Sequence, residues 1–436
     1  MRKNFSTPAV LVIITICLLA GSCSHDGGIS YVTIDLGLEE NTTTSILEKF
    51  RNLFVTRLYA QPPVNLTEIT VNVTAPDMDT VTGTYPASTT SISIEVPSGS
   101  QRTFEVLAQT PSATLRGATT ITIAPGEVTV SINMDVHNTK ILIPDPQNVR
   151  IVQIDDMTGA GWTTLNGSDI SFAISNTLTP YDIDFDSLGR IYIANFSGTS
   201  GEDCVVRIDD ITSTTYTHIN SLSSSGILSV AIDRPNRLVY YANSDTIFRC
   251  GYNDTAPVDT YAMSSFFSNP TIYGISIGSS GIVYIAIRYG TLTATYAICK
   301  FDPDADGGNG LVISSYTGVP NVPWDVMVKD GSCYFANYHE SSVGSNNRVI
   351  QLTADTLSFV KEYGTGTNAT PTAPNELVGP RRFVAVLNDD FYLIDEQGGG
   401  GGYERLLSFS DLNGSNWKDY GSYGSGTGYF DFFYSC

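Results

Sequence analysis

One short segment contains residue types that could bind a metal ion. Asp302, Asp304 and Asp306 alternate with other residues and are followed by Gly307. Carboxylates at alternate positions offer the oxygen ligands that Ca²⁺ prefers, and a glycine permits the sharp turn of such a loop. The last position of a complete EF-hand loop would be Glu, but here it is Ile313. The segment predicts a partial Ca²⁺-binding loop, with a solvated turn as the alternative.

Hydrolytic chemistry finds few candidate residues. The chain contains four histidines, and no Ser/His/Asp triad or histidine metal site can be built from their spacing. Gly398–Gly402 is a run of glycines, but it lacks the lysine and the helix that phosphate-binding loops require. We therefore assign no catalytic residue and favour a binding protein over an enzyme.

The cysteines suggest neither a metal site nor a defined set of disulfides. Seven cysteines are present, and five of them follow residue 23. An odd number leaves at least one unpaired in an oxidising compartment. We expect most to be small buried residues, and their pairing stays open. These five are Cys204, Cys250, Cys299, Cys333 and Cys436.

A segment that recurs about every 50 residues organises the second half of the chain. In its clearest copy, Ile183 and Phe185 alternate with polar residues, which is the pattern of a strand with one buried face. A turn at Gly189 leads to Ile191–Asn195, an apolar run typical of a strand buried on both faces. A third strand follows at Cys204–Ile208. Further copies cover residues 228–250, 275–301, 323–352 and 380–409.

The two ends of this region each supply half of another copy. Val149–Asp155 resembles an outer strand that has no inner partner before it, and Gly428–Phe433 resembles an inner strand with no outer partner. Pairing these halves would remove the free sheet edges and close a ring. The sequence therefore predicts an all-β fold whose residues 148–436 form a six-bladed β-propeller closed by its N- and C-terminal strands.

The repeat pattern of Pro180–Asn195 with Val205–Ile208 resembles the NHL repeat. This repeat is similar to that of the six-bladed propellers grouped with senescence marker protein and gluconolactonase. The resemblance covers about the last 290 residues, and it implies ligand binding at one mouth of the axis without implying a single activity. The lactonases of that group hold a divalent metal with Glu, Asn and Asp. Asp182 or Asp325 matches such a role loosely, but no inner strand begins with Glu, so a metal-dependent lactonase is our second hypothesis.

Aligning the copies places aromatic and charged residues at the start of each inner strand. If these positions surround the channel, they form a rim suited to a sugar or another small organic ligand. The alternative is that the aromatic residues only pack between blades. The predicted rim residues are Tyr181, Asp182, Tyr273, Trp324, Asp325, Arg381, Arg382 and Tyr429.

Residues 30–138 differ in composition and predict a second domain. Short alternating segments separated by turn residues are typical of a β-sandwich, similar to the immunoglobulin- or transthyretin-like modules of bacterial lipoproteins. Residues 45–60 carry apolar side chains at helical spacing, which predicts a short amphipathic helix or an irregular insertion. Residues 139–147 contain Pro144 and Pro146, and we interpret them as a stiff linker that limits movement between the domains.

The first 23 residues have the features of a lipoprotein export signal. Arg2 and Lys3 precede the apolar run Val10–Ala20, and Cys23 follows small residues, as in a lipobox. This pattern predicts cleavage before Cys23, lipid attachment to it and a tether at residues 24–29. Ser24 at the second mature position favours the outer membrane. We expect a bacterial envelope protein that touches the membrane only through its anchor.

The charge of the chain limits its partners. A formal net charge of −21 disfavours nucleic acid and anionic membrane surfaces, which are themselves polyanions. The sequence therefore predicts an envelope binding module for a small ligand, a glycan or a protein. A purely structural envelope scaffold is a third hypothesis.

Overall fold

The computed structural model describes residues 29–35, 65–88, 92–170, 178–196, 203–222, 226–338, 347–366, 373, 375–396 and 403–432. The predicted export signal, Cys23, the tether, Cys436 and the 45–60 segment lie outside the described residues. The regular structure in the described ranges is β, apart from two short 3₁₀ turns, η1 (Met263–Ser265) and η2 (Asp306–Gly308). None of the helices in these ranges is long and apolar enough to span a membrane.

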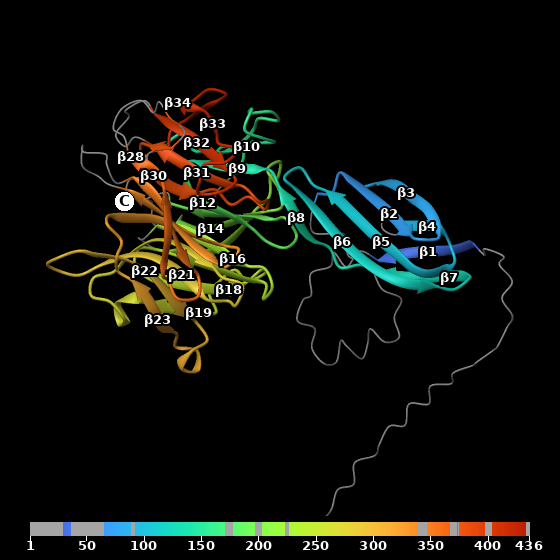
Figure 1. The fold of residues 1–436 in the computed structure, drawn as a ribbon, viewed down its shortest axis with the longest axis horizontal. Helices are drawn as coiled ribbons and strands as arrows, with labels where there is room; N and C mark the ends of the chain where they lie inside the picture. Colours follow the sequence, from blue (N-terminus) through green and yellow to red (C-terminus); the bar gives the residue numbers. More distant parts are fainter. Residues whose placement is uncertain are drawn as a thin grey trace, which may run out of the picture.

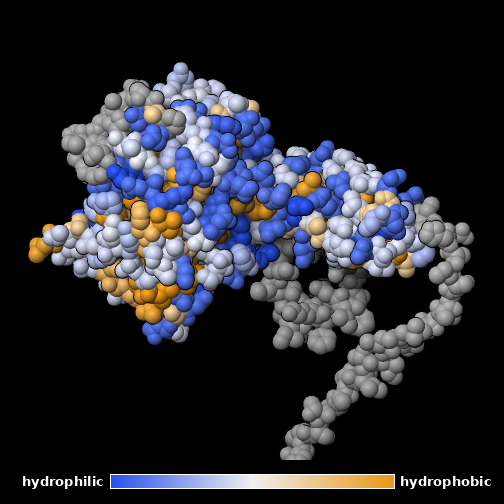
Figure 2. All heavy atoms as spheres, viewed as in Figure 1, coloured by the Kyte–Doolittle hydropathy of each residue, from blue (hydrophilic) through white to orange (hydrophobic). Residues whose placement is uncertain are grey.

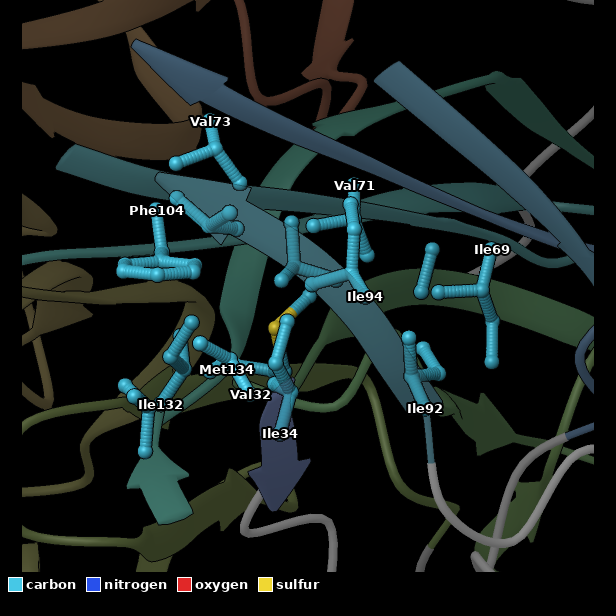
Figure 3. Close-up of a cluster of buried hydrophobic side chains, with 14 of the residues drawn as sticks. Val32, Ile34, Ile69, Val71, Val73, Ile92, Ile94, Phe104, Ile132 and Met134 are labelled. Carbon is cyan, nitrogen blue, oxygen red and sulfur yellow. The ribbon is translucent and has the colours of Figure 1, made fainter. Parts of the chain in front are cut away.

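The N-terminal part folds into two sheets around one hydrophobic core (Figures 1 and 3). Alternation in the sequence explains the core, because every second residue of β2 is buried. Val32, Val71 and Phe104 are completely buried there. One sheet has the order β3-β2-β5-β6-β8 and the other β4-β1-β7. The strands are β1 (Ile29–Asp35), β2 (Glu68–Ala75), β3 (Met78–Pro86), β4 (Ile92–Pro97), β5 (Gly99–Gln109), β6 (Ala113–Ile123), β7 (Gly126–Ser131) and β8 (Asp135–Thr139).

Residues 141–420 form successive sheets whose strands follow one another in chain order from the inner to the outer edge. The first sheet consists of β9 (Ile141–Asp145), β10 (Arg150–Ile154) and β11 (Thr163–Asn166). Five sheets of four strands follow among the described residues. They are β12 (Pro180–Phe185), β13 (Ile191–Asn195), β14 (Asp203–Ile208) and β15 (Thr217–Leu222); β16 (Ser229–Asp233), β17 (Leu238–Ala242), β18 (Thr246–Gly251) and β19 (Asp259–Ala262); β20 (Thr271–Ile277), β21 (Val283–Tyr289), β22 (Thr295–Asp302) and β23 (Leu311–Tyr316); β24 (Val322–Lys329), β25 (Ser332–Tyr338), β26 (Arg348–Thr353) and β27 (Phe359–Tyr363); β30 (Pro380–Phe383), β31 (Phe391–Glu396), β32 (Glu404–Phe409) and β33 (Lys418–Tyr420).

The first strands of successive sheets lie side by side, which gives the array its radial form (Figure 1). β9 contacts β12, and the contacts then continue through β16, β20, β24 and β30. The array closes because Ile141 and Ile143 of β9 share a hydrophobic core with Ile394 and Leu406 of the last sheet. This is the architecture of a β-propeller. On its surface, apolar residues gather around β22 and β23 (Figure 2), where Leu292, Leu311 and Ile313 are exposed.

The prediction that the C-terminal strand completes the first sheet is wrong. β10 pairs with β9 on one side and with β11 on the other. β9 therefore occupies the inner position that was expected for residues 428–433. A short hairpin connects β9 to β10, and this pairing costs far less chain entropy than one between the two ends of the region.

The predicted linker is also structured, because β9 lies within residues 139–147 and all of its residues are buried. Pro144 pairs with Ile151 in the ladder. The first strand of a sheet is an edge, where the missing N–H of proline can be tolerated. The prolines that suggested a linker therefore belong to the innermost strand of the first sheet.

The C-terminal tail nevertheless packs against the place where the ring closes. β34 (Ser422–Tyr423) and β35 (Tyr429–Phe430) form a small parallel pair, as do β28 (Thr365–Gly366) and β29 (Glu376–Leu377). Beyond β35, the Asp431 N–H donates to Asp145 Oδ1 at 2.9 Å. Phe430 and Phe432 are completely buried in the core shared by the first and last sheets.

The N-terminal unit and the propeller are in direct contact. Leu188, in the turn between β12 and β13, is buried in the core of the N-terminal unit. The Val136 N–H donates to Ser187 O at 2.8 Å, and the Ile211 N–H donates to Ser112 Oγ at 3.0 Å. The contact therefore includes both hydrogen bonds and a buried apolar side chain.

Candidate binding site on the propeller axis

The first strands of five sheets enclose a cavity of about 250 Å³ along the propeller axis. Exposure increases toward the C-terminal end of β24 and along the residues that follow β30. Asp325 is 4% exposed and buried at the inner end of the cavity, whereas Lys329 is half-buried and Asn388 is exposed. The cavity therefore opens where the first strands end. Residues from β12, β16, β20, β24 and β30 line it.

This opening lies beside the N-terminal unit. Leu387, which lines the cavity, donates its N–H to Thr139 Oγ1 at the end of β8, at 3.1 Å. Arg234 also lines the cavity, and it interacts electrostatically with Asp135 at the start of β8. A ligand that enters the cavity must pass this strand.

The structure brings three of the predicted rim residues together at the inner end of the cavity. Arg382 Nη1 lies 3.1 Å from Asp182 Oδ2, and both Asp182 and Asp325 line the cavity. Burial raises the pKa of Asp325 to about 7, an effect that Arg382 opposes and the nearby Asp182 carboxylate increases. The pKa of Asp182 is also raised, chiefly by burial. Two carboxyl groups thus share one guanidinium group.

Side-chain oxygens bond the backbone N–H groups of the first strands. Asp182 Oδ2 accepts from the Ser229 hydroxyl at 2.7 Å and from the Val230 N–H at 3.0 Å. The Ser229 oxygen in turn accepts from the Ile275 N–H at 3.1 Å in the next sheet. Asp325 Oδ2 accepts from the Phe383 N–H at 2.9 Å. These bonds connect neighbouring first strands, whose edges would otherwise leave buried donors unpaired.

The other end of the axis is filled by aromatic rings around Arg381. The guanidinium carbon of Arg381 lies 4.1 Å from the ring centre of Trp324 and 3.9 Å from that of Tyr338. Its Nε lies 2.6 Å from Glu396 Oε1. Burial raises the pKa of Glu396 to about 7, although Arg381 opposes this shift. Cation–π stacking and the ion pair together fix the guanidinium group in place.

The remaining predicted aromatic residues pack against this group. The Tyr273 and Trp324 ring centres lie 5.2 Å apart, and Tyr181 lies 4.9 Å from Phe196. Tyr181 is 2% exposed and Trp324 is 6% exposed. The geometry therefore favours packing between sheets, the alternative to an open aromatic rim.

Tyr429 does not join the other predicted rim residues. Its side chain is 46% exposed, and its carbonyl accepts a hydrogen bond from Arg150 Nη2 at 2.7 Å. Because Arg150 belongs to the second strand of the first sheet, Tyr429 lies away from the axis. Its assignment to the rim depended on the strand pairing that proved wrong.

The three aspartates of the predicted Ca²⁺ loop do not gather into a metal-binding cluster in the structure. Asp304 Oδ1 is engaged by Arg249 Nη1 at 2.6 Å, and Asp302 Oδ1 accepts the Asp304 N–H at 3.0 Å. Among the described residues, His, Cys, Asp and Glu nowhere gather in threes as a metal site would need. Asp302, Asp304 and Asp306 instead lie at the end of β22 and in the η2 turn, the solvated turn given as the alternative.

Several residues of the axis escaped the sequence analysis. Asp184 bonds the Ile232 N–H at 2.8 Å and pairs with Arg234. Ser276 accepts the Val328 N–H at 3.0 Å. A signal was present, because Asp182 and Asp184 have the spacing of residues on one face of a strand. Glu396 gave no comparable signal, since it is the last residue of the second strand of its sheet.

Known structures resemble this chain only distantly. Neither a protein-family profile nor a curated protein matches the chain. Solved structures that resemble it include a nidogen/laminin complex, with 13% identity, a TM-score of 0.44 and coverage of 65% of this chain and 92% of that one. Another is the WD40 propeller domain of Doa1, with 12% identity, a TM-score of 0.34 and coverage of 58% and 70%. A third is the PQQ-bound aldose sugar dehydrogenase of Streptomyces coelicolor, with 12% identity, a TM-score of 0.41 and coverage of 62% and 90%. These are β-propeller proteins, and the likeness says nothing of what this chain binds.

Proposed function

We propose that this protein is a binding module that takes a small ligand into the axial cavity of its propeller. This proposal rests on the composition of the axial cavity. It combines largely apolar walls with a few convergent polar groups, which is the usual composition of a small-molecule site. Asp182, Asp325 and Arg382 provide these groups at its inner end.

We further propose a six-bladed propeller of the NHL type, displayed on a β-sandwich that is anchored to the envelope through Cys23. The sandwich would hold the propeller at a fixed distance from the membrane. Its contacts with Leu188 and Ser187 support a rigid spacer. The second hypothesis, a metal-dependent lactonase, has little support, because the two carboxylates described at the inner end of the cavity, Asp182 and Asp325, both interact with Arg382.

A ligand screen tests the binding function. The mature chain would be tested by thermal shift against a small-molecule library, and each hit would be repeated on Asp325→Asn and on Asp304→Asn. Asp325 lines the cavity, whereas Asp304 lies on the surface with a side chain that is 78% exposed. We expect hits to lose their thermal shift only in Asp325→Asn. Hits that bind both variants as they bind the wild type would place the site elsewhere, and a screen without hits would contradict the proposal.

A further inference from the structure

We propose that the axial cavity selects a small organic cation, in which a protonated amine is attached to an apolar body. This inference rests on the proposed function, because it names the class of ligand for the same cavity. Three features of the axis support it: the hydrogen-bonding groups that remain on its wall, the charge at its inner end and the apolar lining.

The wall of the cavity has few free hydrogen-bond donors. In an antiparallel sheet, alternate residues of an edge strand direct both N–H and C=O away from their partner strand. On the first strands, these N–H groups are bonded by side-chain oxygens of aspartate and serine. The donors bonded in this way belong to Ile183, Phe185, Val230, Ile232, Ile275, Val326, Val328 and Phe383.

By the same alternation, the carbonyl groups of these residues point away from the partner strand together with the N–H groups. The backbone of the wall therefore offers acceptors to a ligand, while these N–H donors are already used. A ligand that brings hydrogen-bond donors complements this surface, whereas a carboxylate or phosphate would find carbonyl oxygens. An alkylammonium group supplies three donors and a positive charge.

The inner end of the cavity carries more acid than base. Asp182 and Asp325 share Arg382, so one carboxylate lacks a full counter-ion when both are ionised. The cations at the open end are already engaged. Arg234 pairs with Asp184, and Lys329 interacts electrostatically with Asp330, Asp389 and Asp390. A bound ammonium group would supply the missing positive charge.

The apolar lining determines which chemical group should be attached to the ammonium group of the ligand. Ile183, Val230 and Ile275 line the cavity together with Val326 and Val384. A short alkyl chain could bury its surface against these residues, which favours binding through the hydrophobic effect. A hydrated inorganic cation would gain nothing from them. The lining therefore favours an amine with a hydrocarbon body.

Binding should depend on pH through Asp325. The charged groups that face its carboxyl are Asp182 of β12 and Arg382 of β30, while β20 brings only Gly274 against it. In β25, its ladder partner is Ala336. Because the pKa of Asp325 is about 7, its ionised fraction rises between pH 6 and pH 8. An alkylammonium stays protonated in this range, as lysine does, so its affinity should rise with pH.

A matched ligand series tests the inference on the mature chain. n-Pentylammonium, 1-pentanol and pentanoate share one alkyl body and differ in charge, and calorimetry would measure each at pH 6, 7 and 8. We expect pentylammonium to bind at least about tenfold more tightly than the other two, since a hydrogen-bonded charge commonly contributes this much. Its affinity should rise from pH 6 to pH 8, and Asp325→Asn should reduce it about tenfold. The ligand series requires no variant, so it stands even if Asp325→Asn misfolds.

The possible results separate this inference from the proposed function. If pentanol or pentanoate binds as tightly as pentylammonium, the cavity binds ligands but the cation selectivity is wrong. If millimolar CaCl₂ displaces pentylammonium in competition at constant ionic strength, the site is a metal site and the inference is overturned. If the library screen gives cavity ligands but no member of the series binds, the amine class is wrong. If neither binds, the proposed function itself fails.

Discussion

Several carboxyl groups are buried near the closure of the ring, and their ionisation affects the stability of the fold. Glu404 is 2% exposed, and its Oε2 accepts the Phe432 N–H. Burial raises its pKa to about 8, and the carboxylates of Glu396, Asp431 and Asp145 add to the shift. Folding therefore favours the protonated form of Glu404.

This shift predicts a loss of stability at alkaline pH. The pKa of Glu404 is 4.5 in an unperturbed chain and about 8 in the folded protein. Between these values the folded state binds the proton more tightly, so the contribution of Glu404 to stability is complete below about pH 4.5 and is lost as the pH rises through 8. Glu404→Gln keeps an acceptor for the Phe432 N–H and cannot ionise. We expect it to raise the free energy of unfolding at pH 8 by at least about 1 kcal/mol, with little change at pH 4.5.

Urea unfolding at pH 4.5 and pH 8 would measure this difference. Glu127→Gln is a matched control, because Glu127 is exposed on β7 of the N-terminal unit. This substitution should leave the free energy of unfolding unchanged at both pH values. Equal effects of Glu404→Gln at pH 4.5 and pH 8 would show that Glu404 ionises normally in the folded protein.

The axis shows which residue roles the sequence could indicate. The alignment of repeats placed Asp182, Asp325 and Arg382 at equivalent positions of their first strands, and they converge because these strands surround one axis. The role of Asn195 could not be predicted. Its Oδ1 accepts the Thr179 N–H before the first strand, at 2.7 Å. Such a bond depends on where two distant segments meet, and no local pattern carries this information.

At the level of elements, the C-terminal tail stabilises the ring by packing. The ring centre of Phe430 lies 4.9 Å from that of Phe432 and 5.6 Å from that of Trp162. Its neighbour Tyr429 points outward and is 46% exposed. The sequence predicted that the tail lies where the ring closes, but its predicted position as the inner strand of the first sheet was wrong. The hairpin partner of β10 was missed because its segment contains two prolines, which suggested a linker.

Truncating the two aromatic side chains should have very different consequences. Phe430→Ala removes a completely buried ring and should cost about 3–5 kcal/mol in the free energy of unfolding. Tyr429→Ala changes an exposed residue and should cost less than about 1 kcal/mol. Urea unfolding would measure the free energy of unfolding of both variants. If both variants lost a similar amount of the free energy of unfolding, packing of Phe430 would not be what stabilises the closed ring.

At the level of the whole molecule, the N-terminal unit and the propeller behave as parts of one body. The two prolines were expected to limit movement as a stiff linker. The contact instead depends on Leu188, which comes from the propeller but completes the core of the other unit. The repeat predicted the sheets of the propeller, and alternation predicted most strands of the N-terminal unit. The contact between them could not be predicted, because a leucine in a turn has no sequence signal for a distant partner.

Leu188→Ala should uncouple the two parts. The substitution removes a side chain that is 4% exposed and should cost about 2–5 kcal/mol. We expect calorimetry to show one unfolding transition in the wild type and two in the variant. Leu393→Ala, deep in the propeller core, is the control, because it should lower the transition temperature without splitting the transition. A single transition in Leu188→Ala would contradict the coupling.

The position of the cavity mouth beside β8 also determines the direction from which cargo can arrive. We propose that the chain is held at its N-terminus by the predicted lipid anchor. The N-terminal unit would then stand between the anchor and the propeller, and solutes would reach the cavity mouth beside that unit.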